Sequence, residues 1–273
     1  MRKILPAVLL AILLAGIIST VVLRTFLVYF CVDPATGFYI GNYSLPMYAL
    51  NILTLVFVVL LLVLPLCSKR LSSHSSVPAK NMALCFLSIV SAIVLAVYGV
   101  ERFVQVIAVS SSAGAFLDGL FALASAVYFA WQAAHLRKGT QMHSAALVAL
   151  IPVLWAILHL IVRWMSFTTI ISIPAALFET LQMISFMLFF YYHARSVAEV
   201  KNGHEMKGLL SFGLLSVFLG ILSTVPQIIA SCIGAHNITV DWFSIVLILV
   251  LSIYALVQMF SVFFIKNTKI LAK

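Results

Sequence analysis

Six of the ionisable side chains that lie inside otherwise apolar stretches of sequence are candidates for a binding site. They are Glu101, Arg102, Asp118, His159, Arg163 and Glu179. Carboxylates, guanidinium groups and an imidazole in apolar surroundings can bind a polar solute, exchange protons, or pair with one another to hold helices together. Which of these they do depends on the helix faces and depths that they share.

Helical spacing groups some of these residues. Trp155, His159 and Arg163 are four residues apart and form one stripe on a helix, and Glu179 and Gln182 are three apart. Glu101 and Arg102 are adjacent, so their side chains point about 100° apart on a helix and need other partners.

The composition identifies the surroundings of these residues as a membrane. Of the 273 residues, 64% are hydrophobic and only 8% are charged, and the mean hydropathy is +1.20. These values exclude a soluble domain and a disordered chain, and four cysteines are too few for a disulfide-bonded scaffold. The fold is therefore predicted to be all-α, a polytopic transmembrane helix bundle with the lipid bilayer as its partner.

Eight apolar runs are long enough to cross a bilayer, which takes about 20 residues of helix. We predict spans at 4–30, 46–67, 81–109, 114–135, 144–165, 172–195, 208–232 and 242–265. The runs are too long and too uniformly apolar for barrel strands. Together they make a single transmembrane domain, 1–273, in which the spacing of polar residues also suggests a weak 4+4 parallel repeat, 1–137 and 138–273.

Lysine and arginine residues are concentrated on one side of this bundle. Thirteen of the 16 lie near the termini or in alternate connections, and the other three are Arg24, Arg102 and Arg163. The positive-inside rule then puts both termini in the cytoplasm. The first run is predicted to be an uncleaved anchor, because it exceeds a signal-peptide core in length and no small-x-small site follows it. The net charge of +9 follows from this topology and from contact with anionic lipid, so no nucleic-acid partner is expected.

The charged residues occupy only the outer halves of the predicted spans. Arg24, Glu101, Arg102 and Arg163 lie near the outer boundary, whereas the inner halves carry Gln258 and a few hydroxyl groups but no charge. Glu179 is the deepest charge, about 10 Å from the outer surface. A carboxylate at that depth is costly unless it is paired, protonated or in a wet cavity. Glu179 is thus the best candidate for a pocket residue, whereas boundary arginines can also form structural ion pairs and extend toward water.

Motifs of common catalytic and cofactor sites are absent from the sequence. We find no glycine-rich phosphate loop, no His-Glu-x-x-His, no Gly-x-Ser-x-Gly and no Cys-x-x-Cys. Only His159 lies well inside a span, and histidines near the predicted cytoplasmic surface are interpreted as interfacial, namely His135, His143, His193 and His204. We therefore predict no cofactor, no metal site and no catalytic residues.

The segment after the first predicted span has a distinctive order of residues. Arg24 lies near the end of that span, the aromatic residues Phe26, Tyr29 and Phe30 follow, and Asp33-Pro34-Ala35-Thr36-Gly37 comes next. In this order the chain resembles a group of uncharacterised multi-pass membrane proteins of Gram-positive bacteria with an Asp/Glu-Pro-x-Thr-Gly motif. No activity is known for that group, so the resemblance implies a bacterial plasma membrane and no particular function.

Three functions fit these observations. The first is an outward-facing polar pocket that binds an unknown small solute for transport or sensing. Glu179 and Arg163 would be central to it, and its walls would contain His159, Glu101, Arg102 and Asp118. The second is a non-catalytic accessory or assembly protein with purely structural ion pairs, which would bind a membrane-protein partner. The third, which we favour least, is a membrane-embedded enzyme that uses Glu179 and His159 as acid and base.

Overall fold

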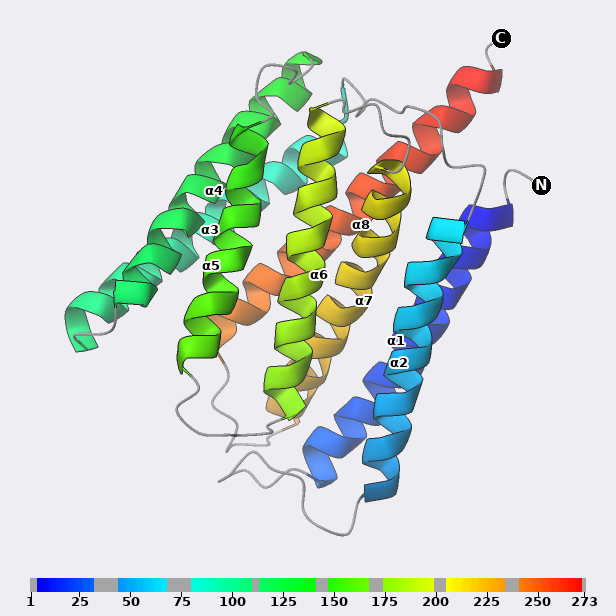
Figure 1. The fold of residues 1–273 in the computed structure, drawn as a ribbon, viewed down its shortest axis with the longest axis vertical. Helices are drawn as coiled ribbons and strands as arrows, with labels where there is room; N and C mark the ends of the chain where they lie inside the picture. Colours follow the sequence, from blue (N-terminus) through cyan, green and yellow to red (C-terminus); the bar gives the residue numbers. More distant parts are fainter. Residues whose placement is uncertain are drawn as a thin grey trace.

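The computed structural model describes residues 4–31, 44–67, 80–109, 113–140, 147–166, 174–198, 205–233 and 241–271. Within these ranges the chain forms eight α-helices, and a short 3-10 helix, η3 (Val148–Leu150), leads into the fifth. The helices are α1 (Ile4–Phe30), α2 (Ser44–Cys67), α3 (Met82–Val109), α4 (Ala113–Lys138), α5 (Ile151–Ser166), α6 (Pro174–Val197), α7 (Glu205–Cys232) and α8 (Trp242–Leu271) (Figure 1).

The helices follow the apolar runs of the sequence. Seven of them are long and apolar enough to cross a membrane, which is the character of an integral membrane protein. Among the described residues α6 does not meet this criterion, and its sequence contains Glu179, Gln182 and His193. The motif that begins at Asp33 lies outside the described residues.

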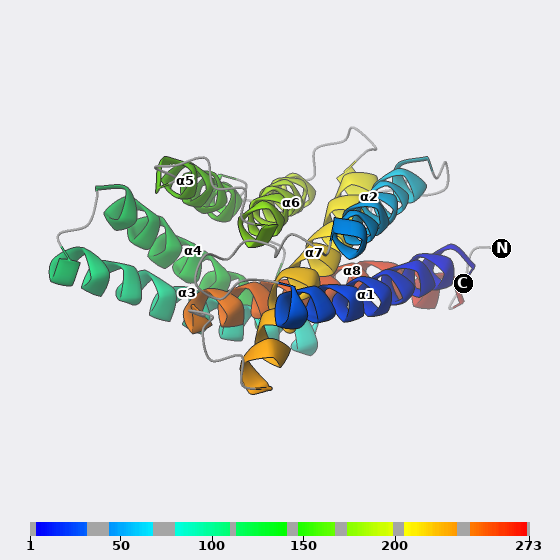
Figure 2. The ribbon, with the colours of Figure 1, turned by 90° about the horizontal axis from the view of Figure 1, so that it is seen from below.

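Consecutive helices alternate in direction through the bundle (Figure 1). α1 begins and α8 ends at the same end of the bundle, uppermost in Figure 1, and we call this the proximal end and the opposite one the distal end. Seen along the bundle, α5, α6 and α2 lie on one side and α3, α8 and α1 on the other, with α4 and α7 between them (Figure 2).

α7 is the most enclosed of the seven apolar helices. Within its most apolar segment 83% of the residues are buried, against 22% for α2, and α7 packs against α1, α2, α6 and α8. Its glycines allow this close packing. A Cβ atom on Gly213 would lie 3.3 Å from the Phe189 ring of α6 and 3.0 Å from the Met259 Cγ of α8.

α3 and α4 form a tight antiparallel pair. A Cβ atom on Gly99 would lie 2.9 Å from the carbonyl oxygen of Gly119, and one on Gly119 would lie 3.1 Å from that of Gly99. A larger residue at either position would push the backbones apart. The crossing brings together Tyr98 and Asp118, which directly precede the two glycines, and the Tyr98 hydroxyl donates a 2.8 Å hydrogen bond to Asp118 Oδ2.

Arg24 joins α1 to the central helix. Its side chain is only 3% exposed, so it does not extend to water as a boundary arginine could. It donates a 2.8 Å hydrogen bond from Nη1 to the carbonyl oxygen of Leu222 in α7. That carbonyl lies four residues before Pro226, which has no N–H to complete the helical hydrogen bond. The Arg24 guanidinium also lies 4.4 Å above the centre of the Phe178 ring of α6.

Arg24 is expected to stabilise the protein by supplying the donor that Pro226 lacks. Replacing Arg24 by leucine should lower the free energy of unfolding by about 1–3 kcal/mol, the range for a buried group left without its hydrogen bond. In a Pro226→Ala background the same replacement should cost less, because residue 226 then has an N–H for the Leu222 carbonyl. Thermal unfolding of the purified protein in detergent measures both losses, with Arg137→Leu on the exposed face of α4 as the control. Equal losses from Arg24→Leu in both backgrounds would contradict this explanation.

Candidate functional site

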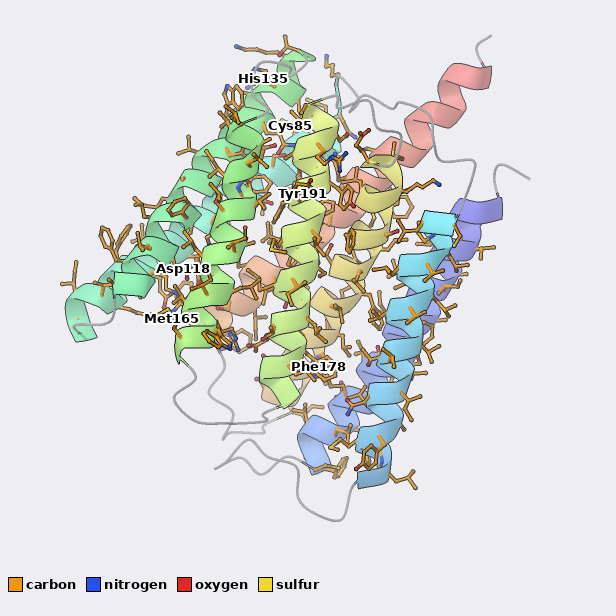
Figure 3. The ribbon with its side chains drawn as sticks, in the orientation of Figure 1. Cys85, Asp118, His135, Met165, Phe178 and Tyr191 are labelled. Atoms are coloured by element: carbon orange, nitrogen blue, oxygen red, sulfur yellow. The ribbon has the colours of Figure 1, made fainter. Side chains whose placement is uncertain are left out.

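A cavity of about 300 Å³ lies in the distal half of the bundle, between α5, α6, α7 and α8, with Tyr98 of α3 at its side. Met165 and Phe178, both labelled in Figure 3, lie in the distal parts of α5 and α6. Three of the six sequence-predicted residues line the cavity, namely His159, Arg163 and Glu179.

The distal rim of the cavity is charged. Arg163 Nη2 donates a hydrogen bond to Glu179 Oε2, so the two residues form an ion pair between consecutive helices. Their side chains are 32% and 23% exposed, which shows that the rim reaches the surface of the protein. On the opposite side, Asp241 accepts hydrogen bonds from the backbone N–H of Ser244 at 3.3 Å and from its hydroxyl at 2.6 Å, and so caps the start of α8.

The middle of the cavity is lined by uncharged polar groups as well as His159. The Ser223 hydroxyl of α7 donates a 2.9 Å hydrogen bond to Oε1 of Gln182. The amide nitrogen of Gln182 has no hydrogen-bond partner among the described residues, although the side chain is fully buried. Such a group is costly to bury alone.

The proximal floor of the cavity is largely apolar and aromatic. Trp155, Phe186 and Leu251 line it, and the Trp155 ring packs edge-on against Tyr98 with 6.3 Å between ring centroids. The indole N–H of Trp155 is buried and has no partner among the described residues. Two side chains that line the cavity, Trp155 and Gln182, thus carry buried donors that no described group satisfies.

A hydrogen-bond network behind the cavity wall fixes His159. Asp118 Oδ2 accepts from the Tyr98 hydroxyl at 2.8 Å and lies 3.2 Å from Nδ1 of His159. Arg102 Nε donates to the Tyr98 oxygen at 2.8 Å and lies 3.6 Å from Asp118 Oδ2. Because the carboxylate can only accept, Nδ1 of His159 carries the proton. In the neutral imidazole the other ring nitrogen, Nε2, is then an acceptor, and it makes no hydrogen bond within the described part of the chain.

Three of the sequence-predicted wall residues, Glu101, Arg102 and Asp118, do not line the cavity. The close packing of α3 on α4 places Asp118 and Arg102 on the far side of Tyr98 and His159, where they bind each other. Glu101 accepts from Gln105 Nε2, and Arg102 donates to Gln105 Oε1 at 2.9 Å. Glu101 and Arg102 were expected to need partners other than each other, and Gln105 is a partner of both, through its amide nitrogen and its amide oxygen respectively.

Several residues of the site were not identified from the sequence as site residues. Tyr98 is four residues before Arg102, and this spacing could have predicted their contact. Asp241 and Ser244 follow the pattern of a helix N-cap, which could have placed a carboxylate at the distal start of α8. Gln182 was grouped with Glu179 by spacing, but no sequence signal indicates its contact with Ser223 on α7.

A second polar cluster lies nearer the proximal end. His193 is 1% exposed, so its interpretation as an interfacial side chain is wrong. Its Nε2 lies 3.0 Å from the Tyr128 hydroxyl, and Gln132 Nε2 donates to the Tyr254 hydroxyl at 2.8 Å. Polarity is thus not confined to the distal half, because tyrosine and glutamine side chains in apolar helices can meet and satisfy one another in the interior.

The arrangement can bind a polar molecule through acceptors and donors at successive depths, and it can accept a hydrogen bond at His159 Nε2. No group of three His, Cys, Asp or Glu side chains is placed to hold a metal ion among the residues that the structure describes.

The chain was compared with protein-family models, with curated proteins and with solved structures, and none of them matches it. The function is therefore argued from the geometry of the cavity and from the sequence.

The ion pair at the rim is expected to couple Arg163 and Glu179 energetically. Glu179→Gln and Arg163→Gln should each lower thermal stability in detergent, and the double replacement should cost less than the sum by about 0.5–1 kcal/mol. Glu179→Gln combined with Arg195→Gln is the control, because Arg195 lies at the other end of α6. Additive losses for the Arg163 and Glu179 pair would show that the contact contributes nothing.

Proposed function

We propose that the chain is an eight-span plasma-membrane protein with both termini in the cytoplasm, and that its distal cavity is an outward-facing pocket that binds a small solute for transport or sensing. The observation that carries this proposal is the cavity itself, a space of about 300 Å³ with a charged, surface-exposed rim. Ligand pockets of about 300–1,000 Å³ with a few converging polar groups are typical of binding sites.

The direction of the chain supports α6 as the eighth span. α5 and α7 both run from the proximal to the distal end (Figure 1), so the segment between them must cross back. α6 has 24 residues, which corresponds to about 36 Å of helix. Its polar residues Gln182 and His193 are buried in the bundle and do not face lipid.

The distribution of positive charge supports the orientation. Thirteen of the 16 Lys and Arg residues lie in segments that this topology assigns to the proximal side, and cytoplasmic segments are enriched in these residues. The proximal end is therefore assigned to the cytoplasm and the cavity to the outside.

A second function, that of an accessory protein whose polar residues are purely structural, is favoured by one observation. Tyr98, Arg102, Asp118 and His159 satisfy one another across α3, α4 and α5, as structural residues would. The partnerless donors of Trp155 and Gln182 favour the pocket instead.

The orientation is tested with single cysteines in a variant whose four native cysteines are replaced by alanine. In intact bacterial cells, a membrane-impermeant maleimide should label cysteines introduced at Ala35 and His236. It should label Ser73→Cys, Thr140→Cys and Asn202→Cys only after the membrane is permeabilised. The reverse pattern would invert the topology.

The outward opening of the cavity is tested in the same background. Ile248 lines the cavity, whereas Ser252, one turn further along α8, is buried and does not. A small charged thiosulfonate added outside should react with Ile248→Cys and spare Ser252→Cys, with Ser244→Cys at the rim as the positive control. Labelling of Ser244→Cys without labelling of Ile248→Cys would mean that the cavity is closed to solutes.

A further inference from the structure

The formal charges that border the cavity already have partners within the protein. Arg163 pairs with Glu179, and His159 faces Asp118. Asp241, the other charged residue of the described lining, takes both of its hydrogen bonds from Ser244 at the exposed rim. Deeper in the cavity, away from the exposed carboxylate of Asp241, a charged ligand would therefore have to break an ion pair or lie without a counter-ion in a poorly hydrated space, which is unfavourable.

The groups that remain without partners are uncharged. Trp155 and Gln182 carry buried N–H donors, and Nε2 of His159 is an acceptor that takes no part in the network behind it among the described residues. These protein donors and this acceptor are complementary to ligand hydroxyl groups, because a hydroxyl can both donate and accept a hydrogen bond. Ligand oxygen atoms at this level would give Trp155 and Gln182 the acceptors that they lack.

The floor of the cavity suits the apolar face of a ring. Trp155, Tyr98 and Phe186 supply aromatic surfaces there, and Ile248 and Leu251 of α8 complete the wall. A saturated ring with hydroxyl groups on its edge could contact these surfaces through its C–H groups while its hydroxyls reach the polar residues above.

We propose that the cavity binds an uncharged, hydroxyl-bearing ring compound of the size of a monosaccharide. This inference rests on the proposed function, because it names the ligand class of the same pocket. Gln182 and Trp155 donate to ligand oxygens, His159 Nε2 accepts from a ligand hydroxyl, and the Arg163–Glu179 pair stays intact at the rim.

The test compares ligands that share one ring and differ in charge. Purified full-length protein, in a detergent without a sugar headgroup, is heated with neutral hexoses, pentoses and inositol, and with the uronate and the amino sugar of each hexose. A ligand that binds only the folded state raises the unfolding temperature. At least one neutral compound should do so in a saturable way, and its uronate and amino analogues should bind at least about tenfold more weakly.

The possible results distinguish a wrong ligand class from a wrong assignment of the cavity as a binding pocket. Equal or tighter binding of a charged analogue would overturn the neutral ligand and leave the pocket in place. If no compound shifts the unfolding temperature, the assignment of this ligand class is wrong. If, in addition, Ile248→Cys resists labelling from outside, the proposed pocket fails as well.

A matched pair of variants tests the donors. Gln182→Glu keeps the size of the side chain and an acceptor for Ser223 but removes both N–H groups, so affinity for the neutral compound should fall about tenfold or more. Asn51→Asp on the exposed face of α2 makes the same amide-to-carboxylate change away from the cavity and should leave affinity unchanged. If Gln182→Glu does not fold, Gln182→Met removes the same donors without a charge. Unchanged affinity in a folded Gln182 variant would overturn the proposed role of this side chain.

Discussion

A backbone carbonyl in a membrane interior needs a hydrogen-bond donor, and Pro226 removes the one that Leu222 would have had in α7. Arg24 of α1 supplies the replacement across 198 residues of sequence. This bond matters because α7 is the helix on which α1, α2, α6 and α8 all pack, and because the turns around Pro226 carry Ser223, Thr224 and Gln227, which line the cavity. The position of that wall therefore depends on an arginine that does not line the cavity itself.

The distal polar residues divide into those that build the wall and those that face the cavity. Asp118 and Arg102 hold Tyr98 and His159 from behind, and this network can form because two glycines let α3 and α4 approach closely. A ring held on one nitrogen presents the other in a defined direction. The buried network is thus compatible with a pocket, since it orients His159 while leaving its Nε2 available.

The sequence predicted most of the fold, because the length and apolarity of a membrane-spanning helix are local properties. It also predicted the contact of Arg163 with Glu179, since both lie near the short connection between consecutive antiparallel helices. It did not predict the partners of Arg24, Gln182 or His193, which lie on helices distant in the chain. Those contacts depend on how helices cross, and crossings depend on details such as the glycines at 99 and 119. Tyrosine, glutamine and serine also occur in apolar helices without special roles, so their presence alone does not indicate a network.

The packing of the first two helices has a consequence for the order in which the protein assembles. α1 and α2 contact each other and α7, but a ribosome synthesises them long before α7 exists. During that interval the hairpin must reside in the bilayer by itself, and its two helices are apolar enough to do so, with mean hydropathies of 2.5 and 2.8. Arg24 has no Leu222 carbonyl to bind until the seventh helix is inserted. Completion of the native structure therefore waits for a late segment to arrive beside an early one.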